Sequence, residues 1–132
     1  MVERQVDLTD VHVLVVDDDV DTLEVFRLAL QLYGATVVTA RTARDALTTV
    51  KTIRLDAVVS DLQMPGEDGL WLADQLRTFA SETGFAIPAL AVTAHWDRYS
   101  NERAKAAGFE AFVGKPIDPL DLSRCVASLV GR

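Results

Sequence analysis

Two kinds of segment alternate along the chain, and this alternation constrains the fold more than any other feature. Five short runs are rich in β-branched and apolar residues, and most of them are apolar at nearly every position: residues 11–16, 35–39, 57–60, 88–93 and 111–114. Strands with this pattern are typical of a parallel sheet, because helices cover such a sheet on both faces.

Segments with helical periodicity lie between the predicted strands. Apolar side chains recur there every three or four residues, as in the buried stripe of an amphipathic helix: Leu23, Phe26, Leu30 and Tyr33; Ala43, Ala46, Leu47, Val50 and Ile53; Leu72, Leu76 and Phe79; and Leu122, Val126 and Leu129. Residues 99–107 also favour a helix, but their apolar stripe is a thin row of alanines, so we expect this helix to pack least firmly. Five strand–helix units predict an open α/β sheet with right-handed crossovers and helices on both faces.

The length of 132 residues points to one domain. A hydrophobic fraction of 49% is sufficient for a core without disulfides or a structural metal. We expect the domain to span residues 11–131 and the polar residues 1–10 to be a leader or a linker. No output domain is expected in this sequence.

Charge and composition exclude several classes of function. The net charge of -7 makes direct binding to nucleic acid unfavourable. No apolar run approaches the ~20 residues of a membrane-spanning helix, and the N-terminus lacks the basic and apolar regions of a signal peptide. The single cysteine, Cys125, excludes an internal disulfide and a multi-cysteine metal site. We therefore expect a cytoplasmic domain that contacts neither nucleic acid nor membrane.

Polar residues follow four of the predicted strands. Asp17, Asp18 and Asp19 follow the first strand, Asp61 follows the third, Thr93 ends the fourth, and Lys115 follows the fifth. In parallel α/β sheets, ligands bind outside the carboxyl ends of the strands. We therefore expect these carboxylates, the hydroxyl and the ammonium group to meet at one rim of the sheet.

The chemistry of this set favours a cation and a phosphoryl group. Two carboxylates ~5 Å apart repel each other by roughly 3 kcal/mol at an effective dielectric constant near 20. A divalent cation such as Mg²⁺, which prefers carboxylate and phosphate oxygens, would relieve this repulsion. An aspartate can attack phosphorus to give an aspartyl phosphate, and Lys115 and Thr93 could then stabilise the transferred oxygens.

An aspartate cluster before a helix can also serve only to cap that helix. We prefer this interpretation for Asp19 and Asp21. It does not account for the other polar residues, because they are spread over the ends of four different strands.

Four sequence blocks together resemble the receiver domain of two-component response regulators. They are VLVVDDD at 13–19, DLQMPGEDG at 61–69, AVTA at 91–94 and FVGKP at 112–116. The resemblance extends over essentially the whole of residues 11–130. It implies a flavodoxin-like (βα)5 fold, a doubly wound parallel sheet with strand order 2-1-3-4-5, and a cis peptide bond before Pro116.

The resemblance also assigns the metal site and the phosphoacceptor. It implies that Asp61 accepts the phosphoryl group. It further implies that Asp17, Asp18, Asp61 and the backbone carbonyl of Gln63 hold Mg²⁺ or Mn²⁺. Gly69 fits the tight loop between Asp61 and the following helix.

Other positions match the phosphate-binding and switch residues of the family. Thr93 matches the switch hydroxyl, with Ala94 beside it in the phosphate-binding group, and Lys115 matches the phosphate-pairing ammonium. Phe112 stands at the switch aromatic, where Tyr is frequent, so the ring is kept while the hydroxyl is lost.

By this resemblance the chain is a phosphorelay module that takes a phosphoryl group from the phosphohistidine of a histidine kinase or a histidine phosphotransfer domain. Phosphorylation would alter binding to a downstream protein or a linked output domain, or to a second copy through the fourth helix, fifth strand and fifth helix. The module would catalyse only its own phosphorylation and dephosphorylation, and any histidine kinase activity would reside elsewhere in a longer parent protein. A stand-alone regulator and the receiver of a hybrid histidine kinase both remain open, with a slight preference for the second.

Two other functions are less compatible with these residues. A phosphatase with Asp61 as its nucleophile normally needs a general acid two residues later, where this chain has Gln63. A flavin-binding module needs a loop that attracts phosphate after the first strand, and the aspartates at 17–19 would repel it.

Four further residues have possible roles outside the metal site and the switch. A loop histidine such as His95 is usually only solvated. The functional alternative is that His95 and the side chain of Gln63 flank the phosphoryl group and adjust the rate at which water removes it. Trp96 is a candidate interface residue, and Cys125 is interpreted as a small core residue.

Overall fold

The computed structural model describes residues 6–95, 97 and 99–132, so the interface prediction for Trp96 lies outside the described residues. The strands are β1 (His12–Val16), β2 (Thr36–Ala40), β3 (Ala57–Ser60), β4 (Ala89–Thr93) and β5 (Ala111–Gly114). The helices are α1 (Val20–Leu32), α2 (Ala43–Thr52), α3 (Gly69–Thr83), α4 (Asn101–Ala107) and α5 (Pro119–Leu129). The strand predictions were correct to within one residue at each end.

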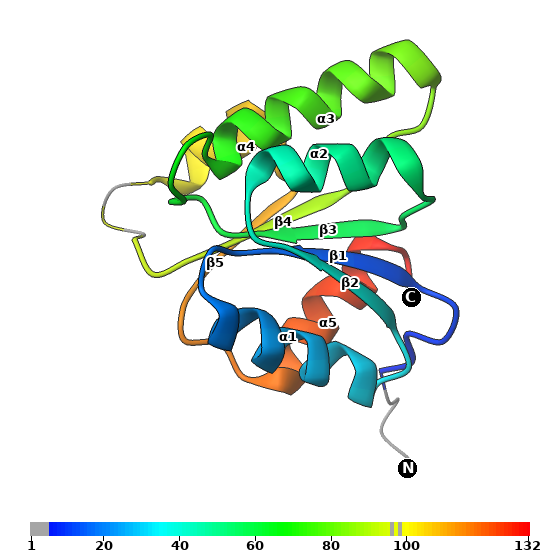
Figure 1. Ribbon diagram of the computed structural model, residues 1–132. Helices are drawn as coiled ribbons and strands as arrows, with labels where there is room; N and C mark the ends of the chain where they lie inside the picture. Colours follow the sequence, from blue (N-terminus) through cyan, green and yellow to red (C-terminus); the bar gives the residue numbers. More distant parts are fainter. Residues whose placement is uncertain (1–5, 96, 98) are drawn as a thin grey trace.

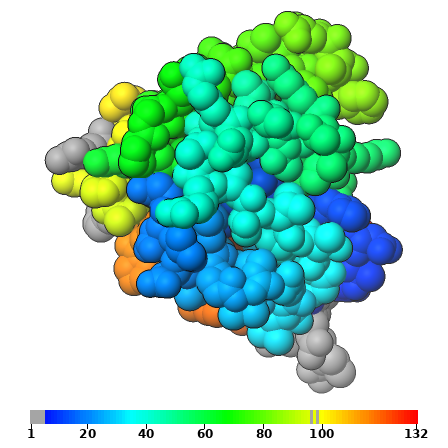
Figure 2. All heavy atoms as spheres, in the orientation of Figure 1, coloured from blue at the N-terminus to red at the C-terminus, as the bar shows by residue number. Residues whose placement is uncertain are grey.

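The five strands form one parallel sheet in the order β2-β1-β3-β4-β5, which confirms the predicted fold and strand order. Helices α1 and α5 cover one face of the sheet, and α2, α3 and α4 cover the other (Figure 1). The outer surface of α1 and α2 is part of the face seen in Figure 2.

Two hydrophobic clusters fill the space between the sheet and the helices. In the central strand β1, Val13 and Val15 belong to the cluster under α1 and α5, whereas Leu14 and Val16 belong to the cluster under α2 and α3. Successive side chains of a strand point to opposite faces, so both sets are buried. This explains why the strand sequences are apolar at nearly every position.

A polar side chain caps the first turn of every helix. The capping residues are Asp19, Thr42, Asp68, Ser100 and Asp118. The capping role predicted for Asp19 is therefore confirmed. Helix α4 begins two residues later than predicted, because Ser100 accepts a hydrogen bond from the amide of Arg103 and so caps it. Ala104 is the buried residue of α4, which agrees with the thin packing expected there.

The segment before β1 already packs onto the sheet. Leu8 is fully buried, and its amide donates a hydrogen bond to the carbonyl of Tyr33 at 2.7 Å. The domain boundary at residue 11 stays a prediction, although packing begins before it. Within the described part of the chain, no helix is long and apolar enough to cross a membrane.

Candidate functional site

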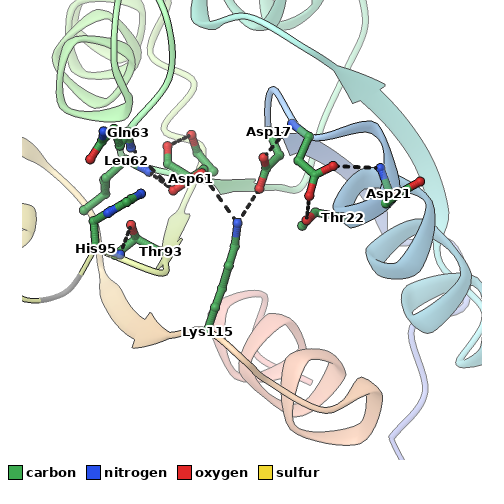
Figure 3. Close-up of polar contacts among 11 residues, drawn as sticks. Asp17, Asp21, Thr22, Asp61, Leu62, Gln63, Thr93, His95 and Lys115 are labelled. Carbon is green, nitrogen blue, oxygen red and sulfur yellow. Dashed lines mark hydrogen bonds and ion pairs between the residues drawn. The ribbon is translucent and has the colours of Figure 1, made fainter.

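The carboxyl ends of β1, β3, β4 and β5 bring four predicted site residues to one rim of the sheet. Asp17 and Asp61 directly follow β1 and β3, Thr93 is the last residue of β4, and Lys115 directly follows β5. Figure 3 shows the Lys115 side chain extending between the two carboxylates. The peptide bond between Lys115 and Pro116 is cis, as the resemblance implied.

Lys115 links the two buried aspartates. Its Nζ lies 2.6 Å from Asp17 Oδ2 and 3.5 Å from Asp61 Oδ2, and 18% of its side chain is exposed. Burial on its own lowers the pKa of Lys115, but the hydrogen bond to Asp17 and the charges of both carboxylates outweigh it and hold the pKa above its ordinary value. Lys115 is therefore a fixed positive charge at the rim.

Asp17 is the most deeply buried of the acidic residues at the rim, with 2% of its surface exposed. Its Oδ1 accepts a hydrogen bond from the amide of Asp19 at 2.9 Å, and its Oδ2 accepts the bond from Lys115. Burial nevertheless raises the pKa of Asp17, because these partners offset the loss of hydration only in part. A further cation beside Asp17 would stabilise the ionised form.

Asp61 has one oxygen held by the backbone and one directed toward Lys115. Its Oδ1 accepts hydrogen bonds from the amides of Leu62 at 2.7 Å and Gln63 at 3.4 Å. Its Oδ2 is the atom that faces Lys115. With 7% of its surface exposed, Asp61 is buried but still reaches solvent. Sequence reasoning missed the Leu62 amide, since any non-proline residue supplies that donor.

The loop between β3 and α3 runs close to Asp61. A Cβ atom on Gly69 would lie 2.3 Å from the Asp61 carbonyl oxygen, so a residue with a side chain cannot occupy this position without a shift of the backbone. Arg44 of α2 forms an ion pair with Glu67 of the loop at 3.1 Å. The guanidinium of Arg44 also lies 5.2 Å from the centre of the Trp71 ring. The loop is thereby fixed against α2.

The acidic residues at the rim fit a divalent cation. One carboxylate oxygen from each of Asp17, Asp18 and Asp61 lies within 4.8 Å of the other two. Three carboxylates face a single ammonium group there, so negative charge is in excess. Hard carboxylate oxygens are the ligands preferred by Mg²⁺. The three carboxylates of the predicted donor set thus lie close together, and the role of the Gln63 carbonyl stays a prediction.

The predicted switch residues lie near the rim but are not all joined to Asp61. Thr93 is fully buried, and its Oγ1 accepts a hydrogen bond from the amide of His95 at 3.0 Å. Among the described residues, no hydrogen bond joins the Thr93 hydroxyl to Asp61. Phe112 is half-buried and packs against the cluster under α2, α3 and α4. Ala94 is exposed beside Thr93.

Figure 3 shows Gln63 and His95 on the side of Asp61 that faces away from Asp17. The Oε1 atom of Gln63 is buried, and it has no hydrogen-bond partner within the described part of the chain. A buried acceptor without a partner is unusual and points to a role for a water molecule or another group.

Comparisons with known proteins agree with the geometry of the rim. The sequence profile of the response regulator receiver domain matches residues 13–127. The chain is 37% identical over 119 residues to an uncharacterised 14.6 kDa protein in the sodA1 3′ region of Leptolyngbya boryana. The aligned region covers 90% of this chain and 89% of that protein. The chain is also 32% identical over 121 residues to the sensor histidine kinase GacS of Pseudomonas protegens. That alignment covers 91% of this chain but only 13% of the kinase.

A solved structure supports the same assignment. The chemotaxis response regulator CheY4 of Vibrio cholerae superposes with a TM-score of 0.81 at 29% sequence identity, over 92% of this chain and 99% of that one. The sequence profile and the superposed structure both cover nearly the whole chain, and the residues that the profile matches include those of the acidic rim. The chain therefore belongs to the response regulator receiver domains, the signalling modules of two-component systems.

Proposed function

We propose that Asp61 accepts a phosphoryl group from the phosphohistidine of a histidine kinase or a histidine phosphotransfer domain. The observation that carries this proposal is the position of Lys115 Nζ between the carboxylates of Asp17 and Asp61. Asp61 Oδ2 is the nucleophile, because Oδ1 is already held by two backbone amides. Its attack forms the P–O bond as the P–N bond breaks, and the imidazole leaves with the electron pair of the broken bond.

Asp17, Asp18, Asp61 and the backbone carbonyl of Gln63 would hold Mg²⁺ or Mn²⁺. The bound cation supplies positive charge for the oxygens of the transferred group. Lys115 supplies a second positive charge from the loop after β5, and its raised pKa keeps it protonated. Asp17 contributes from a buried position, where its charge is least screened by solvent.

Thr93 and Phe112 provide the response to phosphorylation. The Thr93 hydroxyl would turn from the His95 amide to donate a hydrogen bond to a phosphoryl oxygen, next to the exposed backbone of Ala94. Phe112, which packs against the cluster under α2 and α3, would then move into the space that the Thr93 side chain leaves. The surface of α4, β5 and α5 changes as a result, and with it the affinity for a downstream protein, a linked output domain or a second copy.

Helix α1 supports docking of the phosphodonor. Val25, Leu28 and Leu32 are exposed at a spacing of three and four residues along α1. We call these three residues the α1 stripe. A groove of about 420 Å³ adjoins the stripe at Val25 and is also lined by Lys115 and Pro116. A helical partner on the stripe would thus lie next to the phosphoacceptor rim.

The module acts in this proposal as a self-modifying switch in the cytoplasm and not as a general phosphatase. Gln63 cannot donate a proton as a carboxylic acid would, so turnover of foreign phosphate esters is not favoured. The two relatives support different settings. The 14.6 kDa protein is about as long as this chain, whereas GacS contains the matching region as a small part of a kinase.

The test is to incubate the protein with Mg²⁺ and acetyl phosphate and to measure its intact mass. We expect a gain of one phosphoryl group in the wild type, no gain in Asp61→Asn and no gain when Mg²⁺ is chelated. Asp74→Asn is the matched control, because Asp74 is an exposed carboxylate of α3 away from the rim. Equal phosphorylation of Asp61→Asn and the wild type would refute the assignment.

A further inference from the structure

The large hydrophobic residues exposed on the described surface fall into two groups. Four of them lie on α1, and the remaining two are Ile53 and Phe85. Ile53 and Phe85 line the same groove, which has a volume of about 450 Å³. The groove is lined by the C-terminal ends of α2 and α3 and by the segments that lead into β3 and β4, so it lies at the end of the sheet opposite the acidic rim. We call it the basal groove.

The basal groove has an apolar floor and exposed walls. Val50 and Leu55 are buried at its floor, and Phe79 lines it from α3. Its walls are Ile53, which is 42% exposed, and Phe85, which is 65% exposed. A volume of this size lies within the range of roughly 300–1,000 Å³ that is typical of ligand pockets.

Local hydrogen bonds hold Phe85 in its exposed position. Gly84 ends α3 in the left-handed conformation with φ 79°, and its amide donates to the carbonyl of Ala80. The amide of Phe85 donates to the hydroxyl of Thr83 at 3.1 Å. The exposed ring is thus presented by a capped helix end, in a turn with defined backbone geometry.

Two cations border the groove. Lys51 and Arg54 are exposed, and neither forms an ion pair with any described residue. Lys115, which lines the groove beside the acidic rim, is by contrast paired with carboxylates. Lys51 lies in the last turn of α2, where it also offsets the negative end of the helix dipole.

One acidic residue, Asp56, lines the groove as well, but it is half-buried and its Oδ2 accepts a hydrogen bond from the His12 amide at 2.8 Å. Its charge is therefore directed at the backbone of β1. In a chain of net charge -7, an apolar groove bordered by two cations without ion pairs differs from the two other described grooves, whose cations, Lys115 and Arg124, face carboxylates.

We propose that the basal groove binds an acidic peptide segment of a partner protein. The segment places one apolar side chain between Ile53 and Phe85, while its carboxylates pair with Lys51 and Arg54. Aromatic and cationic residues around a desolvated pocket are typical of the residues that dominate binding energies. Charge complementarity excludes a basic segment, because Lys51 and Arg54 would repel it.

This site is separate from the phosphoacceptor rim. Asp56 lies directly before β3 and Asp61 directly after it, so the rise of ~3.3 Å per residue puts the two backbones about 16 Å apart. We therefore expect the peptide to bind whether or not Asp61 is able to accept a phosphoryl group. The groove would thus serve as a constant anchor, while the face of α4, β5 and α5 changes with phosphorylation.

The probe is a fluorescein-labelled peptide of ten residues that contains only aspartate and glutamate around one central phenylalanine. Its binding to the full chain is measured by fluorescence anisotropy, and its site by amide chemical shifts. We expect saturable binding, with shifts at residues 50–56 and 79–87. Phe85→Ser should weaken binding at least tenfold. Lys51→Gln combined with Arg54→Gln should weaken it and reduce its dependence on salt.

Leu32→Ser is the matched control, since Leu32 on α1 is an apolar residue at least as exposed as Phe85. It and Asp61→Asn should bind the peptide as the wild type does. Equal binding of a peptide with lysine in place of the acidic residues, or of one without the phenylalanine, would overturn the proposal. Shifts centred on α1 would do so too. Self-association that Phe85→Ser abolishes would identify a second copy as the occupant and would equally overturn it.

Discussion

Lys115 Nζ lies 2.6 Å from Asp17 Oδ2 and 3.5 Å from Asp61 Oδ2, so the lysine is paired more closely with the aspartate that follows β1 than with the proposed phosphoacceptor. This pairing leaves Asp61 Oδ2 only loosely held. An incoming phosphoryl group can therefore attract the ammonium without breaking a short bond between Lys115 and Asp61.

Replacing Lys115 by methionine should destabilise the fold, because the buried carboxylate of Asp17 loses its cation. We expect a loss of about 1–3 kcal/mol in the free energy of unfolding, measured by urea denaturation without divalent ions. The double variant with Asp17→Asn should recover most of this loss, because no uncompensated charge then remains. Strictly additive effects of the two substitutions would contradict the proposed coupling.

Mg²⁺ should stabilise the protein against thermal unfolding, because it binds the folded rim and not the unfolded chain. At a concentration of 100 times Kd the gain is about 2.7 kcal/mol. Asp17→Asn should lose most of the rise in Tm caused by Mg²⁺, whereas Asp74→Asn should retain it. An equal response of both variants to Mg²⁺ would place the cation elsewhere.

Gly69→Ala should disturb Asp61 directly, because the new Cβ atom would lie 2.3 Å from the Asp61 carbonyl oxygen. We expect a loss of about 1–3 kcal/mol of stability and slower phosphorylation by acetyl phosphate. Gly66→Ala is a useful control, since Gly66 has φ 78° but no atom near the position of a new Cβ. That variant should show backbone strain of about 1 kcal/mol and near-normal phosphorylation. Equal rates for both variants would argue against a steric effect on Asp61.

Gln63→Leu should lengthen the lifetime of the aspartyl phosphate several-fold. The buried Oε1 of Gln63 is an acceptor without a described partner, and it can orient the water that attacks the phosphoryl group. Leucine keeps the volume and removes the acceptor. Phosphate loss is timed by intact mass after the donor is removed, in parallel with His95→Ala. Unchanged lifetimes in both variants would refute a role for these residues in hydrolysis.

Cys125 should be a slow target for alkylation, because burial raises the pKa of its thiol and the charge of Asp121 adds to the effect. Its ionisation also gives a pH dependence of stability with a definite sign. Below the ordinary value of 9.0 the thiol is protonated in both states and contributes nothing. Above 9.0 the unfolded chain loses the proton first, so the free energy of unfolding falls as the pH rises.

Cys125→Ala should remove this part of the alkaline destabilisation, measured by urea denaturation between about pH 8 and pH 11. The rate of reaction with iodoacetamide should be lower in the native protein than in urea. Equal rates in the two states would contradict the burial of the thiol.

Much of the rim could be predicted because a parallel sheet gathers the carboxyl ends of its strands. Asp17, Asp61, Thr93 and Lys115 each stand at or just after a strand end, and the register of the sheet leaves them no other place to meet. The start of α4 was predicted too early, although Ser100 is a strong capping residue and signals the later start.

Other features depend on contacts that residue types do not encode. The bond from the Leu62 amide to Asp61 is made by the backbone, so the side chain at position 62 carries no sign of it. The orientation of Thr93 toward His95 depends on the path of the loop after β4. The exposure of Phe85 could not be predicted either, because a single apolar residue after a helix can be buried or exposed.

Helix α4 has few attachments to the molecule: Ala104 is its buried residue, Ala107 is partly buried, and the Ala106 carbonyl accepts a hydrogen bond from Arg77 of α3 at 2.6 Å. Its amide hydrogens should therefore exchange with solvent through local opening at a much lower free energy than those of β1 or β3, which lie between both clusters. Displacing this helix removes Ala104 from the edge of one cluster and leaves the cluster under α1 and α5 intact. A chemical event at the rim can thus reshape this part of the surface while the global stability of the domain stays nearly constant.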